Sequence, residues 1–121
     1  MNSAIISIID DDGPTRTAVA ALMRAKGFTP STYESAEGFL NARAQDTSQC
    51  IITDIFMPGL SGIELKQRLN HDACTVPVIM ISARLEEHSE SQALASGAFC
   101  VLRKPFKAHA LIQCVERALS R

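Results

Sequence analysis

Four short apolar runs in this chain each end on polar side chains, and this pattern constrains the fold more than any other feature. The runs are AIISII, CIIT, VPVIMI and FCVL. Such runs, almost without charge until they end, are typical of strands buried in a parallel sheet. Because the carboxyl ends of parallel strands lie along one edge of a sheet, the polar residues that follow should meet there. In chain order they are Asp10 with Asp11, Asp54, Ser82 and Lys104.

Segments with helical periodicity alternate with these runs, which predicts repeated β–α units. We expect an α/β fold of the flavodoxin-like (βα)5 type, a doubly wound parallel sheet with strand order 2-1-3-4-5, as a single domain over residues 1–121. That order places the first and third strands side by side. The expected strands are residues 4–9, Thr29–Tyr33, Cys50–Asp54, Val76–Ile81 and Phe99–Leu102.

Capping residues and glycines mark the helix boundaries. Pro14 suits a first helical position, and Ser61 with Glu64 matches a capping box. The fourth helix has only Leu94 and small alanines as apolar anchors, so we expect it to be held lightly. The expected helices run from Pro14 to Gly27, from Ser35 to Ala44, from Ser61 to His71, from Glu86 to Ser96, and onward from Lys107.

Composition excludes several classes of partner. The 12 basic and 13 acidic residues give a formal charge of -1, which provides no electrostatic footprint for nucleic acid or an anionic membrane. The first apolar run is too short to span a bilayer and lacks a basic flank. Four cysteines without metal-ligand spacing suit a reducing compartment. We therefore expect a soluble, cytoplasmic domain with no direct nucleic-acid or membrane partner.

The converging residues suggest phosphoryl chemistry. Carboxylates held close together repel one another, and Mg2+, which prefers oxygen ligands, would relieve that repulsion. Lys104 and Ser82 could then contact the oxygens of a phosphoryl group, with Asp54 as the nucleophile. Each residue also has an ordinary structural explanation. Asp10, Asp11 and Asp12 could form a turn and a helix cap, and the other polar groups could be solvated strand ends.

These motifs resemble the receiver domain of two-component response regulators. The likeness rests on DD after the first strand, TDIFMPG around the third, SA after the fourth and KPF after the fifth, and it covers essentially the whole chain. The segments IDDD, YESAEGFL and MPGLSGIEL are most similar to receivers of the FixJ/NarL type. Such receivers usually precede a helix-turn-helix domain. The resemblance therefore implies a signalling switch that promotes its own phosphorylation and dephosphorylation, rather than a conventional enzyme.

The resemblance assigns roles at the metal and phosphorylation site. Asp54 matches the aspartate that accepts a phosphoryl group from a histidine of a sensor kinase. Asp11 and Asp54 match direct Mg2+ ligands, together with the backbone carbonyl of Phe56, while Asp10 matches an acid that holds the metal through water. A register that uses Asp11 and Asp12 stays open, although Ile9 at the end of the apolar run favours the earlier pair.

The remaining motif residues match the switch. Ser82 corresponds to the hydroxyl that moves to the acyl phosphate, Ala83 to the small residue that leaves access, and Lys104 to the lysine that pairs with a phosphoryl oxygen. The Lys104–Pro105 bond resembles the family's cis peptide. Val101 departs from the pattern, because receivers usually carry an aromatic side chain three residues before the lysine.

Several alternatives remain. The departure at Val101 motivates a diverged receiver that works as an interaction module without phosphorylation. An aspartate-nucleophile phosphatase of the haloacid dehalogenase type fits less well, since its nucleophile follows the first strand. For a receiver, the resemblance implies dimerisation on phosphorylation and control of a DNA-binding effector. The chain ends at Arg121 after the last helix, and the likeness favours a domain excised from a longer regulator over a stand-alone one.

Overall fold

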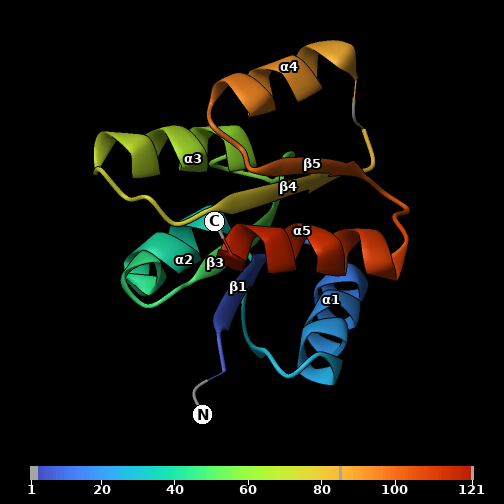
Figure 1. Cartoon of the computed structure of the whole chain (residues 1–121). Coiled ribbons are helices and arrows are strands. Elements are labelled where there is room, and N and C mark those ends of the chain that lie inside the picture. Colours follow the sequence, from blue (N-terminus) through green and yellow to red (C-terminus); the bar gives the residue numbers. More distant parts are fainter. Residues whose placement is uncertain (1–2, 85, 121) are drawn as a thin grey trace.

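The computed structural model describes residues 3–84 and 86–120, and these form one parallel sheet covered by helices (Figure 1). The strand order is β2-β1-β3-β4-β5, which confirms the expected flavodoxin-like topology. Arg121, at which the sequence ends, lies outside the described residues. The strands are β1 (Ile5–Ile9), β2 (Thr29–Tyr33), β3 (Cys50–Asp54), β4 (Val78–Ser82) and β5 (Cys100–Arg103).

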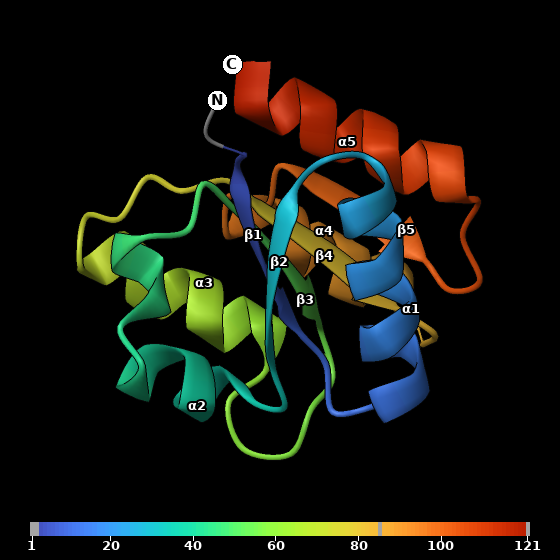
Figure 2. The ribbon, with the colours of Figure 1, turned by 90° about the horizontal axis from the view of Figure 1, so that it is seen from below.

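Helices cover both faces of the sheet, as Figure 2 shows in the view along its edge. One apolar cluster packs α1 and α5 against the sheet, and the other packs α2, α3 and α4 against the opposite face. Every residue of β3 and β4 is consequently buried, which explains their continuous apolar sequences. The helices are α1 (Gly13–Ala25), α2 (Ala36–Asn41), the 3-10 turn η1 (Ala44–Asp46), α3 (Gly62–His71), α4 (Glu87–Ala95) and α5 (Ala108–Ser120).

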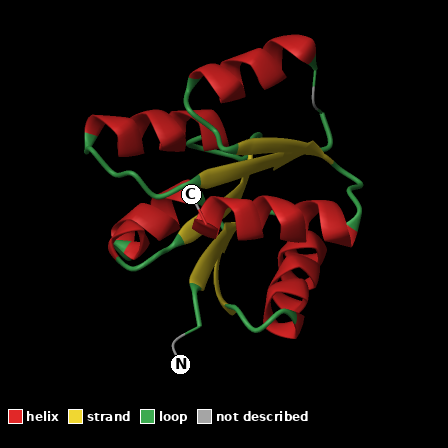
Figure 3. Cartoon of the chain, viewed as in Figure 1, coloured by secondary structure: helices red, strands yellow, loops and turns green. Residues whose placement is uncertain are grey.

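Local capping determines where the helices begin. The side chain of Asp12 accepts a hydrogen bond from the backbone N–H of Thr15 and caps α1. Ser61 and Glu64 form the expected reciprocal capping box at the start of α3. α1 follows β1 and α3 follows β3, each after a loop that leaves the carboxyl edge of the sheet (Figure 3). The caps therefore set where each of these helices begins relative to that edge.

Two sequence expectations about helices were wrong. The second helix ends at Asn41 instead of Ala44, because Arg43 adopts a left-handed conformation with φ 53° that an α-helix does not accommodate. Leu94 does not anchor α4, since its side chain is 51% exposed and Ala93 is the buried residue of that helix. α4 is thus held even more lightly than its sequence suggested.

Smaller differences concern the last two strands. β4 begins at Val78, after Pro77, and extends through Ser82, while β5 is displaced by one residue toward Arg103. Pro77 has no N–H to donate to the sheet, although its carbonyl accepts a bond from Ile51. The Lys104–Pro105 peptide is cis, as expected. Among the described residues, no helix combines the length and apolar character needed to cross a bilayer.

Candidate functional site

The sheet order brings the polar strand ends together at the carboxyl edge. β1 and β3 are neighbours with Ile9 opposite Thr53, so the residues that follow Ile9 lie beside Asp54. β3 in turn pairs with β4, and Ser82 stands one step beyond the partner of Asp54. Ser82 also pairs with Arg103 of β5, which places Lys104 at the same edge. Distant parts of the sequence therefore supply a single site.

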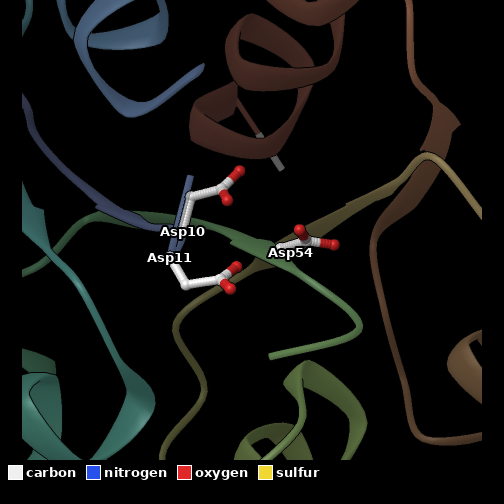
Figure 4. Close-up of side chains that lie close together, drawn as sticks. All are labelled: Asp10, Asp11 and Asp54. Atoms are coloured by element: carbon white, nitrogen blue, oxygen red, sulfur yellow. The ribbon is translucent and has the colours of Figure 1, made fainter. Parts of the chain in front are cut away.

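Three carboxyl groups form the centre of this site. Oxygens of Asp10, Asp11 and Asp54 all lie within 4.8 Å of one another, and Figure 4 shows them side by side at the ends of β1 and β3. Asp10 is completely buried and Asp54 is 8% exposed, whereas Asp11 lies on the exposed side of the cluster. The donor set consists of hard carboxylate oxygens, which fits Mg2+ or Ca2+ better than a soft metal.

Lys104 provides a cation opposite two of the three acids. Its Nζ lies 3.0 Å from Oδ2 of Asp10 and 3.1 Å from Oδ2 of Asp54. Asp10 is further fixed by the backbone N–H of Asp12, which donates to its Oδ1 at 2.9 Å. One ammonium group therefore partly balances a cluster of three carboxyl groups, and the site can accept additional positive charge.

Burial and the neighbouring charges shift the pKa values within the site. Burial raises the pKa of Asp54, and the negative charge of Asp10 acts in the same direction, while the hydrogen bond and charge of Lys104 only partly oppose them. For Lys104, burial by itself lowers the pKa, but hydrogen bonds to Asp10 and Asp54 and the charges of both acids outweigh it and leave the pKa raised. Lys104 is therefore firmly cationic, and Asp54 ionises less readily than an ordinary aspartate.

Residues after β3 and β4 flank the acidic cluster. The backbone N–H of Phe56 donates to Oδ1 of Asp54 at 3.4 Å, and the backbone N–H of Arg84 donates to the buried hydroxyl of Ser82 at 3.0 Å. The Arg84 guanidinium stacks over the Phe56 ring, 5.2 Å from its centroid. The two loops that frame Asp54 are thus in contact with each other.

An open groove of about 580 Å³ adjoins the site. It lies between α1 and the connection from β5 to α5, and its lining is mainly apolar. Lys104 and Ala83 line the groove, so it continues toward the residues around Asp54. Val19, Leu22 and Phe106 supply apolar lining. The groove is therefore an apolar surface beside Lys104 that could accommodate a partner.

A family comparison agrees with this geometry. The model of the response regulator receiver domain matches residues 6–116. The chain belongs to the response regulator receiver family. Receivers of this family act in two-component systems, and the topology, the acidic edge and the cis peptide of this chain all suit a receiver.

Curated relatives of this receiver are transcriptional regulators. The transcriptional regulatory protein TdiR of Thauera aromatica is 31% identical over 119 residues, which cover 98% of this chain and 52% of TdiR. The transcriptional regulatory protein FixJ of Azorhizobium caulinodans is 34% identical over 116 residues, which cover 96% of this chain and 55% of FixJ. The receiver thus spans about half the length of these two relatives.

A solved receiver has nearly the same fold. The crystal structure of FixJ-N superimposes with a TM-score of 0.90 at 32% identity and covers 100% of this chain and 97% of its own. The similarity to receivers of the FixJ type, expected from the sequence motifs, is confirmed by this match and by the FixJ sequence.

The receiver brings most of the residues singled out in the sequence to one place. Oxygens of Asp10, Asp11 and Asp54 lie within 4.8 Å of one another, and Lys104 contacts Asp10 and Asp54. Asp12 instead binds Thr15 through both the backbone and the side chain of that residue, and these hydrogen bonds lower the pKa of Asp12. This arrangement favours the register that pairs Asp10 with Asp11.

Val101, which stands where the resemblance to receivers led us to expect an aromatic residue, lies on β5 opposite Met80 of β4. It is partly buried and packs with the cluster beneath α2, α3 and α4. Val101 thus fills space on the α4 side of the sheet, whereas its neighbours Cys100 and Leu102 pack on the α5 side.

Three residues near the site had no role in the sequence analysis. Arg16 donates to the backbone carbonyl of Asp10 at 2.7 Å, Arg84 stacks on Phe56, and Glu37 accepts a bond from the backbone N–H of Leu60 at 2.9 Å. Arg16 stands four residues after Asp12 in the sequence, but nothing in the sequence indicated the contacts of Arg84 or Glu37. These contacts join segments that only the tertiary fold brings together.

Proposed function

We propose that this receiver accepts a phosphoryl group on Asp54 from a phosphorylated histidine of a sensor kinase and thereby changes its output surface. The observation that carries the proposal is the cluster of Asp10, Asp11 and Asp54 facing the ammonium of Lys104. A sheet edge that combines a carboxylate nucleophile, hard metal ligands and a fixed cation suits phosphoryl transfer.

The proposed metal is Mg2+, held by Asp11 and Asp54 with the backbone carbonyl of Phe56, and by Asp10 through water. These ligands fit because all are oxygen donors and because three carboxyl groups share a single nearby ammonium. When bound, Mg2+ would supply positive charge to the phosphoryl oxygens. Lys104 faces the same carboxylates and would contact another of those oxygens.

In the proposed transfer, a carboxylate oxygen of Asp54 attacks phosphorus and an O–P bond forms. The bond from phosphorus to the imidazole nitrogen of the kinase breaks, and its electron pair returns to that nitrogen. Asp54 must be ionised to attack, and Lys104 favours this form against the effect of burial. The groove beside α1 and Lys104 would receive the helix of the kinase that carries the histidine.

The proposed output lies on α4, β5 and α5. α4 has Ala93 as its buried residue and presents Leu94 to solvent, so few contacts oppose its movement. The phosphoryl charge would draw the Ser82 hydroxyl inward and shift this surface toward dimerisation. In a longer regulator the same surface would control a DNA-binding effector. We infer action in the cytoplasm, which suits the four free cysteines.

Intact mass spectrometry tests the proposal. The protein is incubated with Mg2+ and a small acyl-phosphate donor, and we expect a single added phosphoryl group that is absent from Asp54→Asn and from samples with EDTA. Asp46→Asn, which changes an exposed aspartate of η1, serves as the matched control and should be phosphorylated normally. An adduct that survives in Asp54→Asn would refute the assignment.

A second candidate function is an interaction module that works without phosphorylation, and Val101 at the usual aromatic position favours it. This alternative predicts no adduct with any donor and equal partner binding by the wild type and Asp54→Asn. Membership of the receiver family, together with an acid at the end of β3, argues against the phosphatase hypothesis.

A further inference from the structure

Glu37, in the first turn of α2, reaches across to the loop between β3 and α3. Its Oε2 accepts a hydrogen bond from the backbone N–H of Leu60 at 2.9 Å, although the two residues are 23 positions apart. This hydrogen bond also lowers the pKa of Glu37, so its carboxylate is ionised at neutral pH. α2 thereby holds a loop that begins directly after Asp54.

Both ends of this loop are fixed by other contacts. At its start, the Phe56 N–H donates to Asp54, and at its end, the N–H of Gly62 donates to the carbonyl of Ile55 at 2.8 Å. A Cβ on Gly62 would overlap the backbone oxygen of Asp54, so α3 begins in very close contact with β3. Hydrogen bonds at Phe56 and at Gly62 therefore hold both ends of this short loop.

The middle of the loop depends on Glu37. Pro58 has no N–H, and Gly59 adopts φ +79°, a conformation that favours glycine. A Cβ on Gly59 would overlap the Glu37 carboxylate, so the glycine and the glutamate fit tightly against each other. The bond from Leu60 to Glu37 therefore stabilises the one stretch of the loop that neither end contact constrains.

We infer that Glu37 is a positioning residue that fixes the β3–α3 loop, and with it the Phe56 carbonyl, for binding of a divalent cation beside Asp54. The inference rests on the proposed function, because it takes the Phe56 carbonyl as a metal ligand. Glu37 contacts the loop and not the cation. Its effect should therefore follow its capacity to accept the Leu60 hydrogen bond, rather than its negative charge.

Magnesium titrations followed by amide NMR test this role in the full chain without any phosphorylation. Glu37→Ala should weaken Mg2+ binding about 10-fold. This is the lower end of the range observed when a group that orients a metal ligand is removed. The amide signal of Leu60 should shift and exchange faster with solvent, because its hydrogen-bond acceptor is lost. Glu37→Gln keeps a side-chain oxygen as acceptor. Its affinity for Mg2+ should stay within about threefold of that of the wild type, a smaller loss than the one expected for Glu37→Ala.

Two further variants complete the experiment. Glu116→Ala removes an exposed glutamate near the end of α5, which lies beside the residues that precede β3 and β4 at the opposite edge of the sheet, and should bind Mg2+ like the wild type. Gly59→Ala should weaken binding at least as much as Glu37→Ala, since the added methyl group displaces the carboxylate and an alanine is strained at a φ of +79°. Unchanged affinity in Glu37→Ala overturns the inference, and so does equal weakening in Glu37→Gln, which would point to charge. A wild type that binds no Mg2+ would instead overturn the proposed function itself.

Discussion

The ammonium nitrogen of Lys104 lies 3.1 Å from Oδ2 of Asp54, although the two residues stand 50 positions apart in the chain. The same nitrogen contacts the fully buried Asp10, so one cation is shared between two acids. The three carboxyl groups of the cluster therefore outnumber the single ammonium that faces them. This imbalance connects the stability of the site to its proposed chemistry, because a divalent cation would relieve the repulsion that the fold itself creates.

Replacing Lys104 should destabilise the protein. Lys104→Met leaves Asp10 without its ammonium partner, and removal of one member of a buried ion pair typically costs about 3 kcal/mol of the free energy of unfolding. Urea unfolding in EDTA measures this loss. Added Mg2+ should recover part of it, since a cation again faces the acids. Arg68→Ala, the control, breaks the exposed ion pair with Asp72 and should lower the free energy of unfolding by less than about 1 kcal/mol. Equal losses in Lys104→Met and Arg68→Ala would contradict the prediction.

The raised pKa of Asp54 makes its ionisation unfavourable to the fold in the absence of metal. Burial raises the pKa of Asp54 in the folded protein above its ordinary value of 3.8. The contribution of Asp54 to stability is therefore fully present below its pKa in the unfolded chain and is lost as the pH rises through its pKa in the folded protein. Asp54→Asn should therefore raise the melting temperature at pH 7 in EDTA, and the difference from wild type should shrink at acidic pH. Scanning calorimetry across that range measures the effect. Asp72→Asn is the exposed control, and a lower melting temperature for Asp54→Asn would refute the argument.

The thiol of Cys100 should be unusually slow to react. Burial raises its pKa to about 12, the adjacent Cys114 thiol adds to the shift, and Arg117 opposes it. Since the thiolate is the nucleophile, native Cys100 should alkylate far more slowly at pH 8 than in urea, and its rate should still increase above pH 10. Peptide mass spectrometry of iodoacetamide-treated protein measures both rates. A native rate that levels off near pH 9 would show that the thiol is not shifted.

The strand ends could be predicted from the sequence because a strand that is buried on both faces has an uninterrupted run of uncharged residues. β3 and β4 carry no charge before their final residues, and a parallel sheet has few ways to order such strands. The acids and Lys104 then follow from topology alone. The same reasoning identified Ser61 and Glu64 as a capping box, since that motif is local in sequence.

Features that depend on tertiary packing could not be predicted. Leu94 is the largest apolar residue of α4 and was therefore expected to face the core, but the position of α4 over the sheet buries Ala93 instead. The left-handed conformation of Arg43, which ends α2 early, has no signature in the residue type. The contact between Glu37 and Leu60 likewise joins α2 to the β3–α3 loop, and the assembled sheet alone sets the relative placement of these two segments.

Removing the hydroxyl of Ser82 should separate phosphorylation from switching. The Ser82 side chain is buried and accepts the Arg84 N–H at 3.0 Å, so Ser82→Ala should cost about 1 kcal/mol of stability. Asp54, its neighbouring acids and Lys104 are unchanged, and intact mass should still show one phosphoryl group. Amide signals of α4 and β5, however, should no longer shift on phosphorylation, because no hydroxyl moves toward the new charge. Ser82→Thr keeps the hydroxyl and should retain those shifts. If Ser82→Ala shifted the α4 and β5 signals like the wild type, Val101 or another residue would have to transmit the change.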